Sequence, residues 1–275
     1  MIIYKSTIQK FGLDVDSNGI EDIMVDTYYK RTMSHVSKAE VKAWKNSLVA
    51  MERIVGRSEL PLDAGVAIEY NIPATAKRVD FIISGYNEMK KPSVAIIELK
   101  QWEEAQATSK DAIVKTRFGG NLVETTHPSY QAWSYAELLR SFNAEVYENN
   151  VDLIPCAYLH NFSQSQGNIN TSFYSEHTRL APLFLKEDAN ALRNFLAKQI
   201  KKGDDASIIE RIENSEIKAS KALADSVSKM LQGNLEFVMI DDQKLVFEEA
   251  LFLAEEVKKS GKSVLIVEGG PGTGK

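Results

Sequence analysis

Two predicted strands carry the residues with the clearest capacity for chemistry: Asp80 in one, and Glu98 and Lys100 at the end of the next. Carboxylate oxygens are the hard ligands that Mg²⁺ or Mn²⁺ prefers, and phosphate and water complete such a coordination shell. A metal ion held by Asp80 and Glu98 would polarise a scissile phosphate and lower the pKa of a bound water. Lys100 would orient that water or stabilise the charge that develops at phosphorus. These residues therefore suffice for metal-assisted hydrolysis of a phosphodiester bond.

A structural interpretation of the same residues stays open. Glu98 and Lys100 are two positions apart on a strand and hence on one face, where a simple salt bridge would join them. A hydrogen bond would then satisfy Asp80. However, Asp80 stands between Val79 and Phe81, where an unpaired carboxylate costs free energy. We therefore expect a cation, most economically a metal ion, to compensate it.

The elements that position these side chains follow from the apolar pattern and the turn residues around them. Strands are predicted over residues 66–72, 78–85, 93–100 and 153–159. In the third of these, the two-residue period places Glu98 and Lys100 on one face with Val94 and Ile96, and Ala95, Ile97 and Leu99 on the other. A first helix is predicted to begin after Ser37, which caps it, with an apolar stripe of Val41, Trp44, Leu48, Met51 and Val55. A second helix follows Pro128.

Four further residues join this site as candidates. Gln131 and Tyr135 are four positions apart on the second helix and therefore share a face. Glu40 either faces the metal from the first helix or closes a capping box with Ser37, and the sequence leaves both open. Glu69 either assists the metal or faces solvent on an alternating strand, and we favour solvent.

The order helix, three strands with D then ExK, helix and strand resembles the core of the PD-(D/E)xK nuclease superfamily. Gln131-Ala132-Trp133-Ser134-Tyr135 matches the Q-x-x-x-Y motif of its RecB-like members, in which the resemblance implies a role in positioning DNA or the active-site lysine. The catalytic set that the resemblance implies is Asp80, Glu98, Lys100, Gln131, Tyr135 and Glu40, with Asp80, Glu98 and Glu40 as metal ligands. Val79 stands where the name-giving motif has proline.

A second set of residues lies at residues 269–275, which match a phosphate-binding P-loop up to its lysine. Gly269, Gly272 and Gly274 would let backbone N–H groups close around phosphate oxygens, while Lys275 reaches the outer phosphates. Residues 263–267 predict a buried strand that runs into the loop, and residues 243–258 predict a helix before it. The Ser or Thr that would follow the lysine and hold Mg²⁺ is missing. We therefore expect the chain to be part of a longer protein and to hydrolyse no ATP by itself.

Taken together, the two sets resemble bacterial proteins in which a PD-(D/E)xK-like nuclease domain is fused to a Schlafen-type superfamily-one DNA/RNA helicase domain. The segments that carry the resemblance are residues 40–48, 78–81, 96–102 and 267–275. The resemblance implies that Gln243 belongs to a helicase Q motif that reads adenine, that ATP binds the full-length parent, and that the parent acts in defence against phage or other foreign DNA. A polar helix start explains Gln243 equally well.

Composition sets the remaining expectations. The chain of 275 residues, 44% hydrophobic and with a net charge of −5, predicts a globular α/β protein without a generally basic coat. We expect a PD-(D/E)xK core, a mixed sheet flanked by helices, over residues 1–165, a helical connector over 166–233, and the start of a P-loop domain over 234–275. The single cysteine, Cys156, and the lack of a signal peptide or of an apolar run of about 18 residues predict a cytoplasmic protein outside the membrane.

The sequence leaves three candidate functions open. The first is a metal-dependent nuclease acting on DNA or RNA. The second is a non-catalytic nucleic-acid-binding module that delivers a helicase, and the third is an ATPase fragment with an interaction domain. The intact Asp80, Glu98 and Lys100 favour the first, because folding alone requires none of them. The oligomeric state is not predicted.

Overall fold

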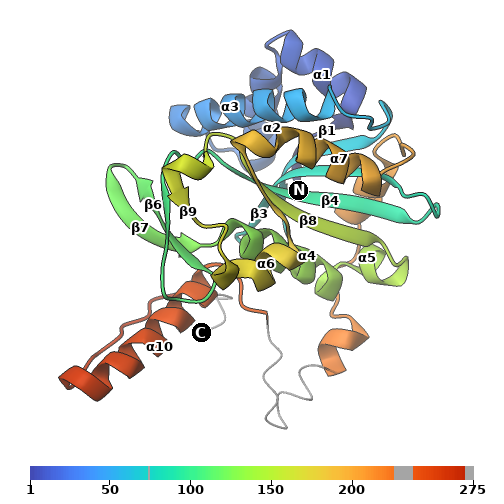
Figure 1. Ribbon diagram of the computed structural model, residues 1–275. Helices are drawn as coiled ribbons and strands as arrows, with labels where there is room; N and C mark the ends of the chain where they lie inside the picture. Colours follow the sequence, from blue (N-terminus) through green and yellow to red (C-terminus); the bar gives the residue numbers. More distant parts are fainter. Residues whose placement is uncertain (74, 226–237, 270–275) are drawn as a thin grey trace.

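A six-stranded mixed sheet forms the centre of the molecule, and helices cover both of its faces (Figure 1). The computed structural model describes residues 1–73, 75–225 and 238–269. In spatial order the strands are β1 (Ile2–Thr7), β2 (Gly65–Asn71), β3 (Arg78–Tyr86), β4 (Pro92–Lys100), β8 (Asp152–Leu159) and β10 (Leu183–Leu185). The first four strands pair antiparallel, whereas β4, β8 and β10 pair parallel because helices cross over between them.

Two separate hydrophobic cores hold the helices on the sheet. One face packs against α1 (Ile8–Asp16), α2 (Ile20–Thr32), α3 (Lys38–Val55) and α7 (Ala189–Gln199). The other packs against α4 (Pro128–Phe142), α5 (Ala144–Glu148) and α8 (Ser207–Glu213). The alternation predicted for β4 is confirmed, because Val94 and Ile96 lie in the second core and Ala95, Ile97 and Leu99 in the first. The α/β class with a mixed sheet between helices is likewise confirmed.

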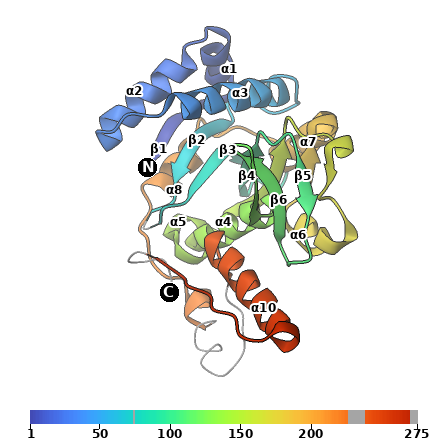
Figure 2. The same cartoon turned by 90° about the vertical axis from the view of Figure 1, so that its left-hand side faces the viewer.

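A smaller sheet stands beside the carboxyl end of β4 (Figure 2). Its strands, in spatial order, are β7 (Asn121–Thr126), β6 (Ile113–Phe118), β5 (Ala105–Ala107) and β9 (Gly167–Asn168). A third apolar cluster, which includes Trp102, Phe162 and Tyr174, packs beneath it close to α6 (Ser175–Leu180). The long helix α10 (Asp242–Ser260) lies against β7. This sheet was not predicted from the sequence, and neither were β1, α1 and α2.

The first predicted helix is α3, and its start is confirmed. The Ser37 hydroxyl accepts a hydrogen bond of 3.1 Å from the Glu40 N–H, and Trp44, Leu48, Met51 and Val55 are buried. The helix begins there because the Ser37 side chain satisfies an N–H group that the first turn leaves without an intrahelical acceptor.

The structure corrects the prediction of a helical connector. Within residues 166–233, β10 joins the main sheet, and Leu192 and Leu196 of α7 are fully buried in the core of the α3 face. Ile208 and Ile212 of α8 complete the core on the opposite face. The described part of this segment therefore belongs to the central fold, because both faces of the sheet would otherwise expose apolar side chains to water.

Of two predictions for the last part of the chain, the structure confirms one and contradicts the other. The helix predicted over residues 243–258 is present as α10. The strand predicted over residues 263–267 is absent: these residues are irregular, and Val264 and Ile266 are 84% and 79% exposed. A strand requires a hydrogen-bonded neighbour, and no described strand lies beside this segment. Among the described residues, no helix is long and apolar enough to cross a bilayer.

Candidate active site

Asp80 and Glu98 face each other at the point where β3 and β4 separate. The ladder between the two strands begins with Phe81 opposite Ile97, and the same register continued by one residue sets Asp80 opposite Glu98. The Asp80 Oδ2 atom accepts a hydrogen bond of 2.8 Å from the Leu99 N–H, replacing a backbone bond of the ladder. The side chain of Asp80 is thus fixed at this fork, on the strand beside the one that carries Glu98.

Glu98 is almost fully buried and is paired with Lys100. Lys100 Nζ lies 2.6 Å from Glu98 Oε1, whereas Glu98 Oε2 has no hydrogen-bond partner among the described residues. Burial and then the Asp80 carboxylate raise the pKa of Glu98 well above its ordinary value. Burial lowers the pKa of Lys100, but Glu98 and Asp80 outweigh it and hold that pKa above the ordinary value. Lys100 is therefore a cation at neutral pH.

Gln131 and Tyr135 stand on the face of α4 that is turned toward Glu98. Gln131 Nε2 donates a hydrogen bond of 3.0 Å to the Tyr135 hydroxyl, which in turn donates to Asp241 Oδ2. Burial and then the charge of Glu98 raise the pKa of Tyr135, so the hydroxyl keeps its proton. Lys77 Nζ lies 3.1 Å from the same Asp241 oxygen. The structure therefore joins the predicted glutamine and tyrosine to the ExK strand and adds Asp241.

On the α3 side, Asp80 lines a cavity of about 150 Å³ together with Glu40, Glu69 and Arg78. Arg78 Nη1 donates a hydrogen bond of 2.9 Å to Glu40 Oε1, and Arg78 Nε pairs with Glu69 Oε2. Glu40 thus turns toward this cavity and Arg78, while the Ser37 cap holds without it. Of the two interpretations of Glu40, the structure favours a side chain at the site.

Glu69 does not face solvent, contrary to the expectation. It is 5% exposed, and its Oε1 accepts a hydrogen bond of 2.7 Å from the Trp44 indole N–H. Both faces of β2 are covered, and Glu69 adopts a left-handed φ of 58° that interrupts the alternation of its strand. Burial first, and then Asp80, raise the pKa of Glu69 to about 8, although Arg78 and Trp44 oppose the rise. A buried carboxyl group that titrates near neutrality is well suited to proton transfer.

The predicted metal ligands are only partly gathered. Asp80 and Glu40 line the α3 cavity, whereas Glu98 shares the α4 face of its strand with Val94 and Ile96. Within residues 1–73, 75–225 and 238–269, no cluster of three or more His, Cys, Asp or Glu side chains is arranged to hold a metal ion. The donor chemistry nevertheless suits a divalent cation, because both carboxylates supply hard oxygens and one buried oxygen of Glu98 has no hydrogen-bond partner among the described residues.

Of the residues that match a P-loop, the structure describes only Gly269. Gly269 is exposed and irregular, and Gly272, Gly274 and Lys275 lie outside the described residues. Gln243 Oε1 accepts a hydrogen bond of 3.1 Å from the Ile240 N–H at the start of α10. This contact agrees with the interpretation of Gln243 as a polar helix start and leaves its proposed contact with adenine untested.

Sequence reasoning missed two contributors to the site, Lys77 and Asp241. Asp241 lies 164 positions after Lys77, so only the folded chain brings the two together. The one local signal was the acidic pair Asp241-Asp242. Comparisons of this chain with protein-family models, curated proteins and solved structures give no match.

Proposed function

We propose that this chain is a metal-dependent nuclease that hydrolyses phosphodiester bonds in DNA or RNA. The observation that carries the proposal is the position of Asp80 opposite Glu98, where β3 and β4 separate and Glu98 keeps one buried oxygen without a partner. A protein gains no stability from two such carboxyl groups side by side, because each disfavours the ionisation of the other. A site that binds a divalent cation explains why both are present.

In this proposal Asp80 and Glu98 hold Mg²⁺ or Mn²⁺, and Glu40 is the nearest candidate for a further ligand. The metal, when bound, would polarise the scissile phosphate and activate water. The oxygen of a water forms a bond to phosphorus, the bond from phosphorus to one sugar oxygen breaks, and that oxygen leaves with a proton. Lys100, as a cation, stabilises the negative charge that grows on the phosphate oxygens. Glu69, with its pKa of about 8, is a candidate proton carrier in the adjoining cavity.

Gln131 and Tyr135 have a positioning role in this proposal. Their hydroxyl and amide groups are within hydrogen-bond distance of each other, and the electrostatic field of Glu98 reaches Tyr135. They support the α4 side of the ExK strand. This strand carries Lys100, whose ammonium group stabilises charge on the phosphate only if its orientation is kept.

A non-catalytic nucleic-acid-binding module is the second candidate. The ion pairs of Glu98 with Lys100 and of Glu40 and Glu69 with Arg78 favour it, because they satisfy these carboxylates without any metal. The two candidates predict different effects of a divalent metal. Only the nuclease would cleave a bound strand when the metal is present.

The test is cleavage of labelled single-stranded and double-stranded DNA and RNA with Mg²⁺, Mn²⁺ or EDTA. We expect cleavage only with metal, and its loss in Asp80→Asn and Lys100→Ala. The matched control is Asp26→Asn, which removes an exposed carboxylate paired with Lys30 far from the site. Circular dichroism verifies that each variant is folded. Cleavage that is equal in wild type and in both site variants, or absent with every metal, would overturn the nuclease proposal.

The sequence resemblance alone supports a further proposal, which concerns the cellular role of the nuclease. We propose that the nuclease works in the cytoplasm beside an ATP-driven helicase, and that the two act against phage or other foreign DNA. The P-loop match of residues 269–275 supports the helicase part of this proposal. ATP binding by the natural protein and its loss in Lys275→Ala test this part, because the lysine of a P-loop contacts the outer phosphates.

A further inference from the structure

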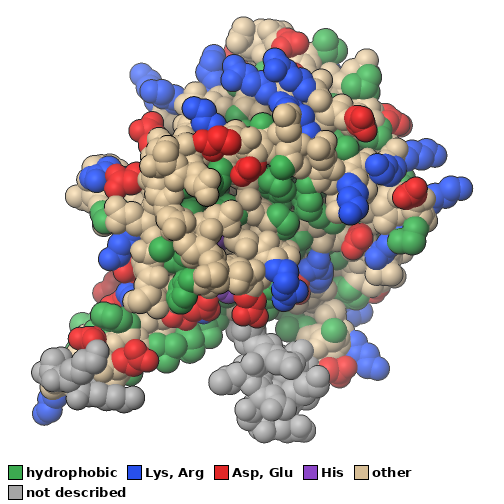
Figure 3. All heavy atoms as spheres, viewed as in Figure 1, with side chains coloured by type: hydrophobic (Ala, Val, Ile, Leu, Met, Phe, Trp, Pro, Cys, Tyr) green, Lys and Arg blue, Asp and Glu red, His purple; other side chains and the backbone are tan. Residues whose placement is uncertain are grey.

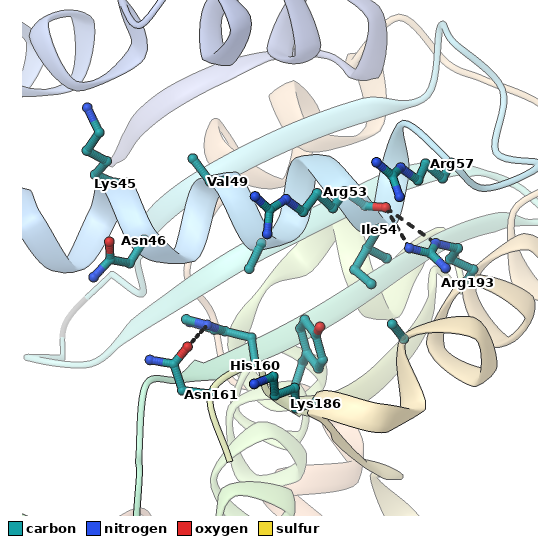
Figure 4. Close-up of a pocket in the computed structure, with 13 residues that line it drawn as sticks. Lys45, Asn46, Val49, Arg53, Ile54, Arg57, His160, Asn161, Lys186 and Arg193 are labelled. Atoms are coloured by element: carbon teal, nitrogen blue, oxygen red, sulfur yellow. Dashed lines mark hydrogen bonds between the residues drawn. The ribbon is translucent and has the colours of Figure 1, made fainter. Parts of the chain in front are cut away.

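A second and larger cavity lies on the same side of the sheet as α3, with a volume of about 630 Å³. Figure 4 shows that α3 forms its upper wall, and that the end of β8 and the segment entering α7 form the lower one. Tyr158, His160 and Asn161 follow the course of β8 into this cavity. The cavity is thus built from three elements that the central fold holds rigidly together.

The lining of this cavity is strongly cationic. It contains Lys45, Arg53, Arg57, Lys186 and Arg193, and no Asp or Glu is among its described lining residues. Figure 3 shows Lys and Arg side chains gathered on the upper part of this face, over α3. This local excess of positive charge contrasts with the whole chain, whose net charge is −5. A concave surface lined by charges of one sign attracts anions.

Most of these cations have no internal counter-ion. Lys45 pairs with Glu21 at 3.2 Å, but the other four form no ion pair with any described residue. Arg193 instead donates to the backbone carbonyl of Arg53, which ties α7 to α3. Two acidic residues follow Lys186: Glu187, whose charge interacts with Lys186, and Asp188, which accepts a hydrogen bond of 2.9 Å from the Leu185 N–H. The positive field is therefore available to a ligand.

The cationic cavity neighbours the cavity at Asp80 along α3. Lys45 and Asn46 line the former, while Trp44 and Ser47 line the latter. Between the two, the Ser47 hydroxyl lies 3.2 Å from His160 Nε2 and accepts a hydrogen bond of 3.0 Å from Gln101 Nε2. One short polar bridge thus separates the cluster of carboxylates from the cluster of cations.

The spacing along α3 suits a polynucleotide backbone. At about 1.5 Å per residue, Ser47 and Arg53 are about 9 Å apart along the helix axis. Successive phosphates of one strand advance by about 3.4 Å along a duplex axis. A strand that follows α3 would therefore place about two to three phosphates between Ser47 and Arg53.

We propose that this cavity binds the backbone phosphates of the substrate strand, away from the cleaved bond, without reading its sequence. This inference rests on the proposed nuclease function and adds the anchor that keeps the strand in register with Asp80. Arginine suits the role, since its planar guanidinium matches a phosphate with two donors. In this proposal the two kinds of charge have different roles. The carboxylates bind the metal at the scissile phosphate, and the cations bind the flanking phosphates.

The test measures binding apart from cleavage. The chain carrying Lys100→Ala is titrated in EDTA with fluorescein-labelled 20-nucleotide single-stranded DNA or RNA, and anisotropy is recorded from 50 to 200 mM NaCl. The test variant adds Arg53→Gln and Arg57→Gln, whose exposed side chains form no ion pair with a described residue. The matched control adds Lys198→Gln and Lys201→Gln, which also removes two exposed cations but lies outside the cavity.

We expect the cavity variant to bind at least about tenfold more weakly, with a slope of log K against log salt that is shallower by about 1.4, and the control to change less than about twofold. Equal affinity and slope in the cavity variant and its parent would overturn the proposal, as would a parent that binds no nucleic acid. Inorganic phosphate and mononucleotides are titrated as well. If these bind the cavity and the strand does not, the site serves a small phosphorylated ligand instead.

Failure of the anchor and failure of the nuclease give different results. If the cavity variant binds weakly but Asp80→Asn never affects cleavage, the anchor stands and the catalytic assignment falls. If cleavage depends on Asp80 and metal but both variants bind alike, the nuclease stands and the anchor falls. Where both hold, Arg53→Gln and Arg57→Gln in a chain that keeps Lys100 should raise KM for the 20-nucleotide strand and leave kcat within about twofold, because these cations contact only flanking phosphates.

Discussion

The hydroxyl of Tyr135 donates a hydrogen bond to the carboxylate of Asp241, which joins the middle of α4 to the start of α10. Asp241 is 8% exposed and adopts a left-handed φ of 40°, so the chain turns sharply to reach this position. Tyr130 makes a parallel contact, because its hydroxyl donates a hydrogen bond of 2.7 Å to the Met239 carbonyl. The segment that leads into α10 is thus docked directly beside Glu98 and the candidate active site.

We therefore expect Tyr135→Phe to loosen this docking. Loss of one buried hydrogen bond to a carboxylate should lower the free energy of unfolding by about 1–3 kcal/mol. Amide hydrogen exchange in residues 239–249 should accelerate, which urea denaturation and exchange measured by mass spectrometry together test. Tyr29→Phe is the control, because its ring is 42% exposed and stacks on His35. Unchanged exchange in Tyr135→Phe would show that other contacts suffice to hold α10.

The pKa of Glu69 predicts a dependence of stability on pH. Its folded-state value of about 8 lies above the ordinary value of 4.5, so the folded protein binds the proton more tightly than the unfolded chain. Stability from this group is fully present below about pH 4.5 and is lost as the pH rises through about 8. One pKa unit corresponds to about 1.4 kcal/mol, so the loss is on the order of a few kcal/mol.

Glu69→Gln should flatten this part of the profile, because an amide accepts the Trp44 hydrogen bond and does not ionise. The measurement is the free energy of unfolding in urea at intervals from pH 5 to pH 8.5. A residual decline with pH should remain, since Glu98 also has a raised pKa. Glu148→Gln, at an exposed position of α5, is the control. A wild-type profile that rises over this interval would contradict the assignment.

The contrast between Ser37 and Glu69 shows what sequence alone can predict. The cap at Ser37 and the alternation of β4 follow from interactions among residues close in the chain, and both were predicted. Glu69 was misplaced because a left-handed residue breaks the period of its strand and because distant helices cover both faces of β2. The same limit applies to β10 and Asp241, whose partners are fixed by tertiary packing, which local patterns do not encode.

Metal binding should release protons. A carboxylate must be deprotonated to bind a metal, and the raised pKa of Glu98 keeps a proton on this group to higher pH. We therefore expect affinity for Mn²⁺ to increase with pH, by up to about tenfold per unit if one proton is released. Titration calorimetry in two buffers of different ionisation enthalpy measures the release directly. Glu98→Gln should abolish it, and equal enthalpies for the wild-type chain in both buffers would contradict it.

Arg78 should stabilise the protein mainly by neutralising Glu69 and Glu40. Arg78→Ala leaves both carboxylates without their cation, and removing one partner of a fully buried pair costs about 3–5 kcal/mol. Because the Arg78 side chain is 35% exposed, solvent screens the loss, and we expect about 2–3 kcal/mol. Arg78→Lys should recover only part of it, since an ammonium group lacks the fork that reaches two carboxylates at once.

A double-mutant cycle separates this pairing from a general loss of packing. At pH 9, where the Glu69 carboxyl group is ionised, Arg78→Ala should cost at least about 1 kcal/mol less in the presence of Glu69→Gln than in the wild-type chain, because no charge on Glu69 is left unpaired. The same cycle on the exposed pair of Lys30 and Asp26 should give a coupling energy below about 0.5 kcal/mol. Additive losses at Arg78 and Glu69 would mean that Arg78 acts through packing of its aliphatic stem and not through its charge.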